Sequence, residues 1–176
     1  MTADPIDRIL SQWRQVRPDL DLRPMGVIGR LGRFAKLGEK RIEETLARFD
    51  LSIADFDVLA SLRRSGPPYR LTPTQLYRTM MITSGTMTNR IDRLEERHLV
   101  ERMADPDDRR GTLVALTAEG RKLVDSTVTA HLETEADILS GLTRAEQAAL
   151  DGLLRKLLAA MVPEEPEAKP AMKRKA

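Results

Sequence analysis

The stretch from Thr83 to Arg110, with the run GTLVALTAEGR that follows it, constrains the fold of this 176-residue chain more than any other. A short segment with helical periodicity and a polar face ends near Glu96, and two apolar segments of strand character follow at residues 99–103 and 112–116. The turn between these segments reads ADPDDRRG, and its Asp-Pro pair favours a tight turn. Helix, strand, charged turn and strand in this order are typical of a recognition helix followed by a β-wing. The stretch therefore predicts sequence-specific binding to duplex DNA.

The helical segment has an apolar side and a side suited to contacting bases. At about 100° per residue, Met87, Ile91 and Leu94 fall together and are expected to face the core. Asn can bond adenine and Arg can bond guanine with two hydrogen bonds, and Thr can contact a thymine methyl group. An ordinary amphipathic helix with a hydrated face is the alternative. The side opposite the core carries Gly85, Thr88, Asn89, Asp92 and Arg93, and Ser84 and Gly85 are small enough to let the helix start approach a groove.

The charged turn between the two strands predicts a minor-groove contact. An Arg at the tip of a wing can enter a narrow minor groove, where negative potential is concentrated. Asp108 is placed to orient a neighbouring Arg rather than to meet DNA. A plain charged hairpin is the alternative. The acids of this region must be paired internally or directed away from phosphates, because the formal net charge of the chain is only +2.

Composition argues against an enzyme. The chain has no cysteine, which excludes disulfides and thiolate metal sites, and its two histidines, His98 and His131, have no catalytic or metal-binding motif around them. We therefore expect no catalytic residues, no metal and no cofactor. No apolar run approaches about 18 residues, and Asp4, Asp7 and Arg8 interrupt the place of a signal peptide. These features predict a cytoplasmic protein that does not associate with membranes.

Capping signals and helical periodicity divide the rest of the chain. The flanking helices carry more apolar surface than a winged-helix core can cover, which predicts a dimer. Three helix starts are marked by a capping residue and a partner three positions later: Ser52 with Asp55, Thr72 with Gln75, and Thr143 with Glu146. The expected parts are an N-terminal extension helix with an RPDLD turn (1–23), a helical dimerisation region (24–50 and 117–161), a winged helix-turn-helix (51–116) and a disordered tail (162–176).

The run DPDDRRGTLVALTAEGR, preceded by NRIDRLEERHLVER, resembles the MarR family of winged-helix transcriptional regulators, and the resemblance covers residues 25–161. It implies a mainly α fold, in which long helices flanking a winged helix-turn-helix form an intertwined homodimer. It also implies a repressor that reads the two halves of a pseudo-palindromic operator in double-stranded DNA. By this resemblance, Ser84, Gly85, Thr86, Thr88, Asn89 and Arg93 would read or flank bases, Arg110 helped by Arg109 would enter the minor groove, and Thr72, Thr74 and Gln75 would touch the DNA backbone.

A second set of residues suggests a sensor. Asp57 and Arg90 each lie at the edge of the buried face of their helix, where they could pair with each other or line a polar pocket behind the recognition helix. Together with Trp13 they resemble the MarR subgroup that binds urate and related small anions. The resemblance implies that a small anionic or aromatic effector binds Trp13, Asp57 and Arg90 and releases DNA through a population shift. A structural role for all three residues is the alternative. For the chain as a whole, the alternative function is a helical dimer that binds a protein partner without specific DNA binding.

Overall fold

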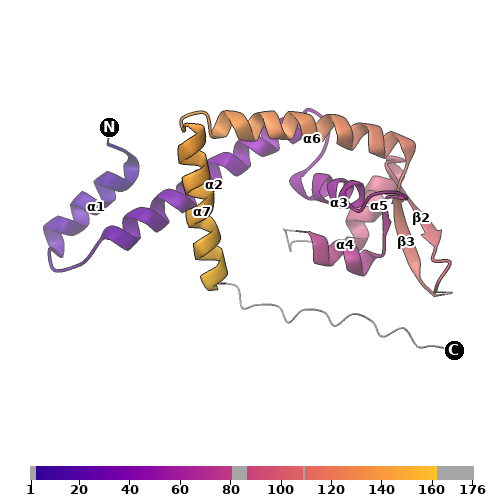
Figure 1. Cartoon of the computed structure of the whole chain (residues 1–176), viewed down its shortest axis with the longest axis horizontal. Coiled ribbons are helices and arrows are strands. Elements are labelled where there is room, and N and C mark those ends of the chain that lie inside the picture. The colour runs from indigo at the N-terminus through magenta and orange to yellow at the C-terminus, as the bar shows by residue number, and fades with distance from the viewer. Residues whose placement is uncertain (1–2, 81–86, 109, 162–176) are drawn as a thin grey trace. The chain divides into compact units, whose positions relative to one another are not determined.

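The computed structural model of the chain describes residues 3–80, 87–108 and 110–161, and it is mainly helical (Figure 1). The described residues up to Ala136 belong to one compact unit, and those from Asp137 onward belong to a second. The elements in chain order are α1 (Pro5–Val16), α2 (Arg23–Ala47), α3 (Ile53–Arg64), β1 (Arg70–Leu71), α4 (Pro73–Thr79), α5 (Met87–Glu96), β2 (Val100–Ala104), β3 (Thr112–Leu116), α6 (Ala118–Ile138) and α7 (Arg144–Met161).

The three helices α3, α4 and α5 gather beside the β2–β3 hairpin (Figure 1). The sheet is antiparallel with strand order β1-β3-β2, and Arg102 of β2 lies opposite Val114 of β3. Two strands were predicted, and the structure adds β1 as a third, pairing Leu71 with Val114. A continuous apolar core joins these elements, because burying such side chains removes them from water. The fully buried large side chains of this core include Leu59, Leu62, Leu76, Ile91, Leu94 and Val114.

The predicted helix starts are confirmed. At α4, the backbone N–H of Gln75 donates to Thr72 Oγ1 at 3.1 Å, and the backbone N–H of Thr72 donates to Gln75 Oε1 at 2.8 Å. Each such pair satisfies two N–H groups that the first turn of a helix leaves without a helical partner. The same reciprocal bonds join Ser52 to Asp55 at α3 and Thr143 to Glu146 at α7.

Gly120 allows the start of α6 to lie directly on the segment that leaves α5. A Cβ atom at this position would lie 1.9 Å from the carbonyl oxygen of Leu99. Thr117 completes the junction, since its backbone N–H donates to that same oxygen at 3.2 Å and its hydroxyl donates to the carbonyl of His98 at 2.7 Å. The position of α6 is therefore tied to the end of α5 and the beginning of β2.

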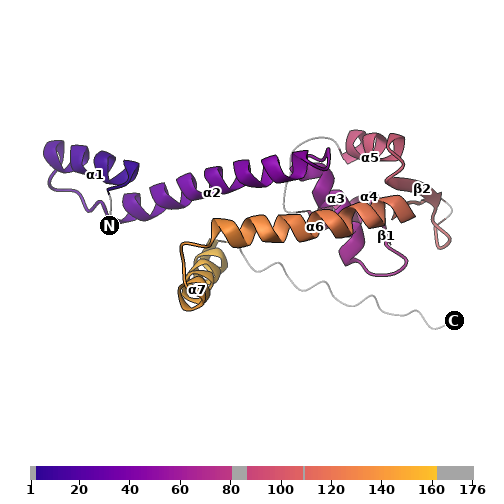
Figure 2. The same cartoon turned by 90° about the horizontal axis from the view of Figure 1, so that it is seen from above.

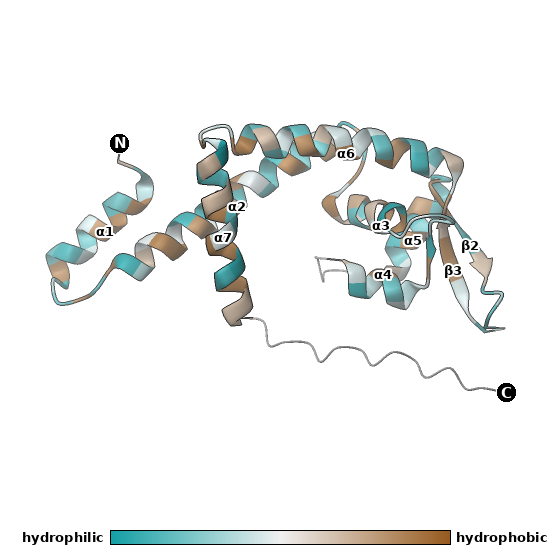
Figure 3. Cartoon of the chain, in the orientation of Figure 1, coloured by the Kyte–Doolittle hydropathy of each residue, from teal (hydrophilic) through white to brown (hydrophobic). Residues whose placement is uncertain are grey.

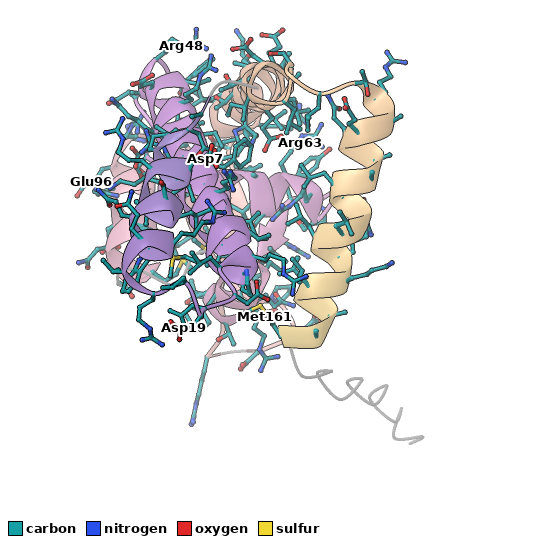
Figure 4. The ribbon with its side chains drawn as sticks, turned by 90° about the vertical axis from the view of Figure 1, so that its left-hand side faces the viewer. Asp7, Asp19, Arg48, Arg63, Glu96 and Met161 are labelled. Carbon is teal, nitrogen blue, oxygen red and sulfur yellow. The ribbon has the colours of Figure 1, made fainter. Side chains whose placement is uncertain are left out.

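The N-terminal helix α1 packs against α2. Arg30 of α2 forms ion pairs with Asp4 at 2.7 Å and with Asp7 at 2.5 Å, and Asp7 is labelled in Figure 4. Asp4 also caps α1, since its carboxylate accepts hydrogen bonds from the first turn of the helix. Gly26 brings the two helices close together, because a Cβ there would lie 3.3 Å from the side chain of Leu10. These contacts fix the position of α1, the predicted N-terminal extension helix, on α2.

Large apolar side chains remain exposed along the flanking helices. The helix α2 has 25 residues. Figure 2 shows it from above as one unbroken helix. Apolar and polar residues alternate along both α2 and α7 (Figure 3), and no residue of α7 is buried. Across the described part of the chain, no helix combines the length and apolar character that crossing a membrane requires. The exposed large apolar residues of these two helices are Met25, Val27, Ile28, Phe34 and Leu37 of α2 and Leu153, Leu157, Leu158 and Met161 of α7.

Candidate nucleic-acid interface

The helix α5 presents the face that the sequence predicts. Ile91 and Leu94 are buried and Met87 packs against the core, whereas Thr88 and Asn89 are exposed. Two residues suited to base contacts thus lie on the open side of the first turn of α5. The predicted contacts Ser84, Gly85 and Thr86 lie outside the described residues.

Arg93 lies on the same side of α5 as Asn89, since the two residues are four positions apart. Its guanidinium Nη2 donates to Asp55 Oδ1 of α3 at 2.9 Å. The side chain of Arg93 is 61% exposed, whereas that of Asp55 is 10% exposed. The exposure of Arg93 agrees with the sequence analysis, but its partner was not foreseen. Asp55 was expected only to help cap α3, and it also reaches the recognition helix.

The wing turn is ordered by bonds among its own residues. The N–H of Asp105 donates to the carbonyl of Gly111 at 3.0 Å, and the N–H of Gly111 donates to the carbonyl of Asp108 at 2.8 Å. The carboxylate of Asp108 accepts the backbone N–H of Arg110 at 3.0 Å. Asp108 therefore fixes the backbone from which Arg110 projects, and the Arg110 side chain is exposed. The predicted wing residue Arg109 lies outside the described residues.

Arg102 ties the wing to the recognition helix. Its guanidinium, on β2, forms ion pairs with Glu95 and, at 2.5 Å, with Asp92, both on α5. Its backbone N–H also donates to Glu95 Oε1 at 3.0 Å. The expectation that acids of this region are paired internally is confirmed for Asp92 and Glu95. Neutralising them in this way reduces the repulsion that phosphates would otherwise meet beside α5.

The predicted backbone contacts lie at the start of α4. Thr74 and Gln75 are exposed, while Thr72 is partly covered. The capping box uses Thr72 Oγ1 and Gln75 Oε1 as acceptors, which leaves the hydroxyl hydrogen of Thr72 and the amide hydrogens of Gln75 as donors. This start of α4 can therefore keep its cap and still donate to phosphate oxygens.

Asp57 lies in a polar cluster behind α5. Burial raises the pKa of the Asp57 carboxyl, and electrostatic interactions with Arg64, His131 and Arg90 oppose that rise. Asp57 Oδ2 is buried and accepts no hydrogen bond from any described residue. The structure thus brings Asp57 and Arg90 within electrostatic range of each other, as the sequence predicts. It adds Arg64 of α3 and His131 of α6, which the sequence analysis missed.

The helical spacing of the sequence could have predicted where His131 lies. It continues the helical spacing of Val124 and Val128, so it falls on the side of α6 that faces the core. Its Nδ1 is buried and has no hydrogen-bond partner among the described residues, and its ring centroid lies 4.9 Å from that of Phe56.

Trp13, the third predicted effector residue, lies on α1 and is 40% exposed. The ion pairs and close contacts described for α1 join Asp4, Asp7 and Leu10 to α2. In the described ranges, no group of three or more His, Asp or Glu side chains is arranged to hold a metal ion.

Comparison with known proteins decides the family. Residues 51–112 match the model of the MarR family, and these residues include α3, α4, α5, β2 and the turn that leads into β3. The transcriptional regulator PecS from Dickeya dadantii (strain 3937) is 41% identical over 152 residues, which cover 86% of this chain and 92% of PecS. The chain belongs to the MarR family. It is a DNA-binding transcriptional regulator of MarR type and not an enzyme, which sets aside the alternative of a protein-interaction module without DNA binding.

Solved structures agree with this assignment. Sco3205 from Streptomyces coelicolor, a MarR family regulator solved in complex with DNA, is 25% identical with a TM-score of 0.72, covering 84% of this chain and 93% of its own. BpsR from Bordetella bronchiseptica is 32% identical with a TM-score of 0.65, covering 74% of this chain and 91% of its own. The structure of BpsR concerns the regulation of its DNA binding by 6-hydroxynicotinic acid. The winged helix-turn-helix predicted from the sequence is confirmed as the fold.

Proposed function

We propose that this regulator is a repressor that binds a pseudo-palindromic operator as a homodimer, with α5 in the major groove and Arg110 in the adjacent minor groove. The observation that carries the proposal is the exposed pair Thr88 and Asn89 at the start of α5, opposite its buried side. Asn can bond adenine with two hydrogen bonds, and Thr can contact the thymine methyl group. The predicted residues Ser84, Gly85, Thr86 and Arg109 are part of the same proposed surface. Thr72, Thr74 and Gln75 supply the proposed backbone contacts.

The exposed apolar side chains of the flanking helices support a second copy of the chain as the partner. Val27 and Ile28 of α2 are 55% and 65% exposed, and Leu153 and Leu158 of α7 are 59% and 60% exposed. Exposed apolar surface of this extent is unusual for a monomer. Residues 24–50 and 117–161 are therefore proposed as the dimerisation region, with residues 51–116 as the DNA-binding part. A two-fold dimer reads two half-sites about one helical turn, or a multiple of it, apart.

A small anionic or aromatic molecule is the proposed effector, held by Asp57, Arg90 and Trp13. The buried, unpartnered oxygen of Asp57 supports a ligand that brings a hydrogen-bond donor, and the neighbouring Arg90 supports one that carries negative charge. The relative BpsR responds to 6-hydroxynicotinic acid, an anion of this class at neutral pH. Trp13 of α1 is the third residue of the proposed site. The effector releases DNA by binding better to a conformation in which α5 is displaced from the groove.

The proposed cellular location follows from the proposed binding to operator DNA. We place the regulator in the cytoplasm, where operator DNA is accessible to it.

The decisive experiment titrates effector against operator binding in one cuvette. A labelled duplex selected from a random pool by the wild-type protein serves as operator, and its fluorescence anisotropy reports DNA release. Because Trp13 is the only tryptophan in the chain, its fluorescence reports effector binding. We expect 6-hydroxynicotinate or urate to quench Trp13 and release DNA over the same concentration range, and both effects to be lost in Asp57→Asn. Quenching without release would contradict the regulatory mechanism. If quenching and release are both absent, the proposed effector site is wrong, but the proposal of DNA binding still stands.

A further inference from the structure

Asp55 joins the start of α3 to the exposed side of α5. Its Oδ2 accepts the hydroxyl of Ser52 at 2.6 Å and the backbone N–H of Ser52 at 3.3 Å, which closes the cap of α3. Its Oδ1 accepts Nη2 of Arg93 at 2.9 Å. A carboxylate that is only 10% exposed needs such partners, because burying an unpaired charge is costly. The two oxygens of one carboxylate therefore serve two different elements.

Arg93 retains hydrogen-bonding capacity while Asp55 holds it. A guanidinium has five N–H donors, and the bond to Asp55 uses one of them. The long Arg side chain loses rotamer entropy when it is fixed on a ligand, and a contact already present in the free protein reduces that loss. Because Arg93 is 61% exposed and shares its side of α5 with Asn89, its remaining donors are available beside the residue proposed to read a base.

We propose that Asp55 is a positioning residue for DNA recognition: its carboxylate holds Arg93 on the DNA-facing side of α5 in the free protein. Asp55 does not itself touch DNA. The chemical group that Arg93 meets is an acceptor on DNA, either a phosphate oxygen or a base edge. This inference rests on the proposed placement of the exposed side of α5 against DNA.

The chain offers a matched control one turn further along. Arg97 also pairs with an aspartate, with its Nη2 lying 3.3 Å from Asp50 Oδ2, but its shorter bond, at 2.6 Å, is to the backbone carbonyl of Asp50. The side chain of Asp50 is 93% exposed. Asp50 has a positive φ of 56°, which Asn tolerates well. Asp50→Asn thus removes a carboxylate beside an Arg near the C-terminal end of the same helix without disturbing a buried contact.

The test is a double-mutant cycle with Asp55→Asn and Arg93→Gln in the full chain. Affinity is measured by fluorescence anisotropy for the selected duplex and for a scrambled duplex of the same composition. Because the two residues are expected to act as one coupled contact, each single variant should bind the selected duplex on the order of tenfold more weakly. The double variant is expected to bind no more weakly than either single variant, and Asp50→Asn is expected to bind as wild type does. Unchanged or tighter binding by Asp55→Asn, or additive losses in the double variant, would overturn the inference.

Ser52→Ala separates positioning from capping. It removes the hydroxyl that caps α3 but leaves the charge of Asp55, so we expect a lower melting temperature with nearly unchanged affinity for the selected duplex. If Ser52→Ala loses as much affinity as Asp55→Asn, Asp55 acts through the stability of α3 and the inference fails. Asn89→Ala distinguishes this failure from failure of the proposed function. If Asn89→Ala loses binding while Asp55→Asn does not, the inference about Asp55 fails but the proposed contact of α5 with DNA is retained. If Asn89→Ala and Arg93→Gln both bind as wild type does, the inference and the proposed function both fail.

Discussion

Gly120→Ala tests whether α6 lies directly on the backbone that leaves the recognition helix. The added Cβ would lie 1.9 Å from the Leu99 carbonyl oxygen and 2.8 Å from its carbonyl carbon. An ordinary contact begins near 3.4 Å, so α6 or the Leu99 backbone must move by about 1.5 Å. Overpacking a core usually costs about 1–3 kcal/mol, and here the obstacle is backbone rather than a side chain that can rotate. We therefore expect a loss of about 3 kcal/mol or more, which lowers the melting temperature by about 6–12 °C for a chain of this size.

Gly152→Ala in the middle of α7 is the matched control. No heavy atom lies within 4 Å of a Cβ built at Gly152, so the substitution gains helix propensity without a clash. Replacing an interior helical Gly by Ala stabilises by about 0.5–1 kcal/mol, so its melting temperature should rise slightly. Thermal unfolding followed by circular dichroism measures both variants. A Gly120→Ala protein that melts at or above the wild-type temperature would refute the close contact of α6 with Leu99.

Two further predictions concern the dimer and the buried carboxyl. Leu153→Ala with Leu157→Ala should weaken dimerisation by about 2–4 kcal/mol, or roughly 30- to 1000-fold, because both copies lose apolar side chains that are now 59% and 47% exposed. Sedimentation velocity over a dilution series measures this, and the exposed Lys156→Ala should leave the dimer unchanged. Asp57→Asn should raise the melting temperature at pH 7. Burial raises the pKa of Asp57 in the folded protein above its ordinary value of 3.8. The wild type therefore loses stability as the pH rises from 3.8 through the folded pKa. Below pH 3.8 the melting temperatures of the wild type and Asp57→Asn should converge. A variant that melts lower at pH 7 would mean that attraction to neighbouring cations outweighs burial.

Local chemistry explains which parts of the fold were predictable. The capping pairs at Ser52, Thr72 and Thr143 were found from sequence because the two residues of each pair lie three positions apart, and the bonds between them depend on little else. The buried side of α5 was found because its apolar spacing matches the helical repeat. The strand β1 was missed because Arg70 and Leu71 are too few for an alternating pattern, and they pair with β3 only after the chain has folded.

The contacts that hold the recognition helix α5 in place could not be predicted from the sequence. Asp55 and Arg93 are 38 residues apart, and nothing local marks them as partners. Arg102 was not singled out because an Arg on a short strand reads as a solvated side chain, yet it holds the wing to α5. Asp57 and Arg90 were noticed because each is polar at the edge of an apolar side. Their neighbour His131 comes from α6, 74 positions beyond Asp57 in the chain, and only tertiary packing places it there.

The central claim, that the exposed side of α5 and the wing read DNA, is tested most directly by one salt series. Anisotropy is measured for wild type, Asn89→Ala and Arg110→Ala on the selected and scrambled duplexes. We predict a preference of the wild type for the selected duplex of at least about 1000-fold. Asn89→Ala should lose about 1–3 kcal/mol on the selected duplex alone, and Arg110→Ala should lower the salt slope by about one. Variants that match the wild type in affinity, preference and salt slope would contradict the account.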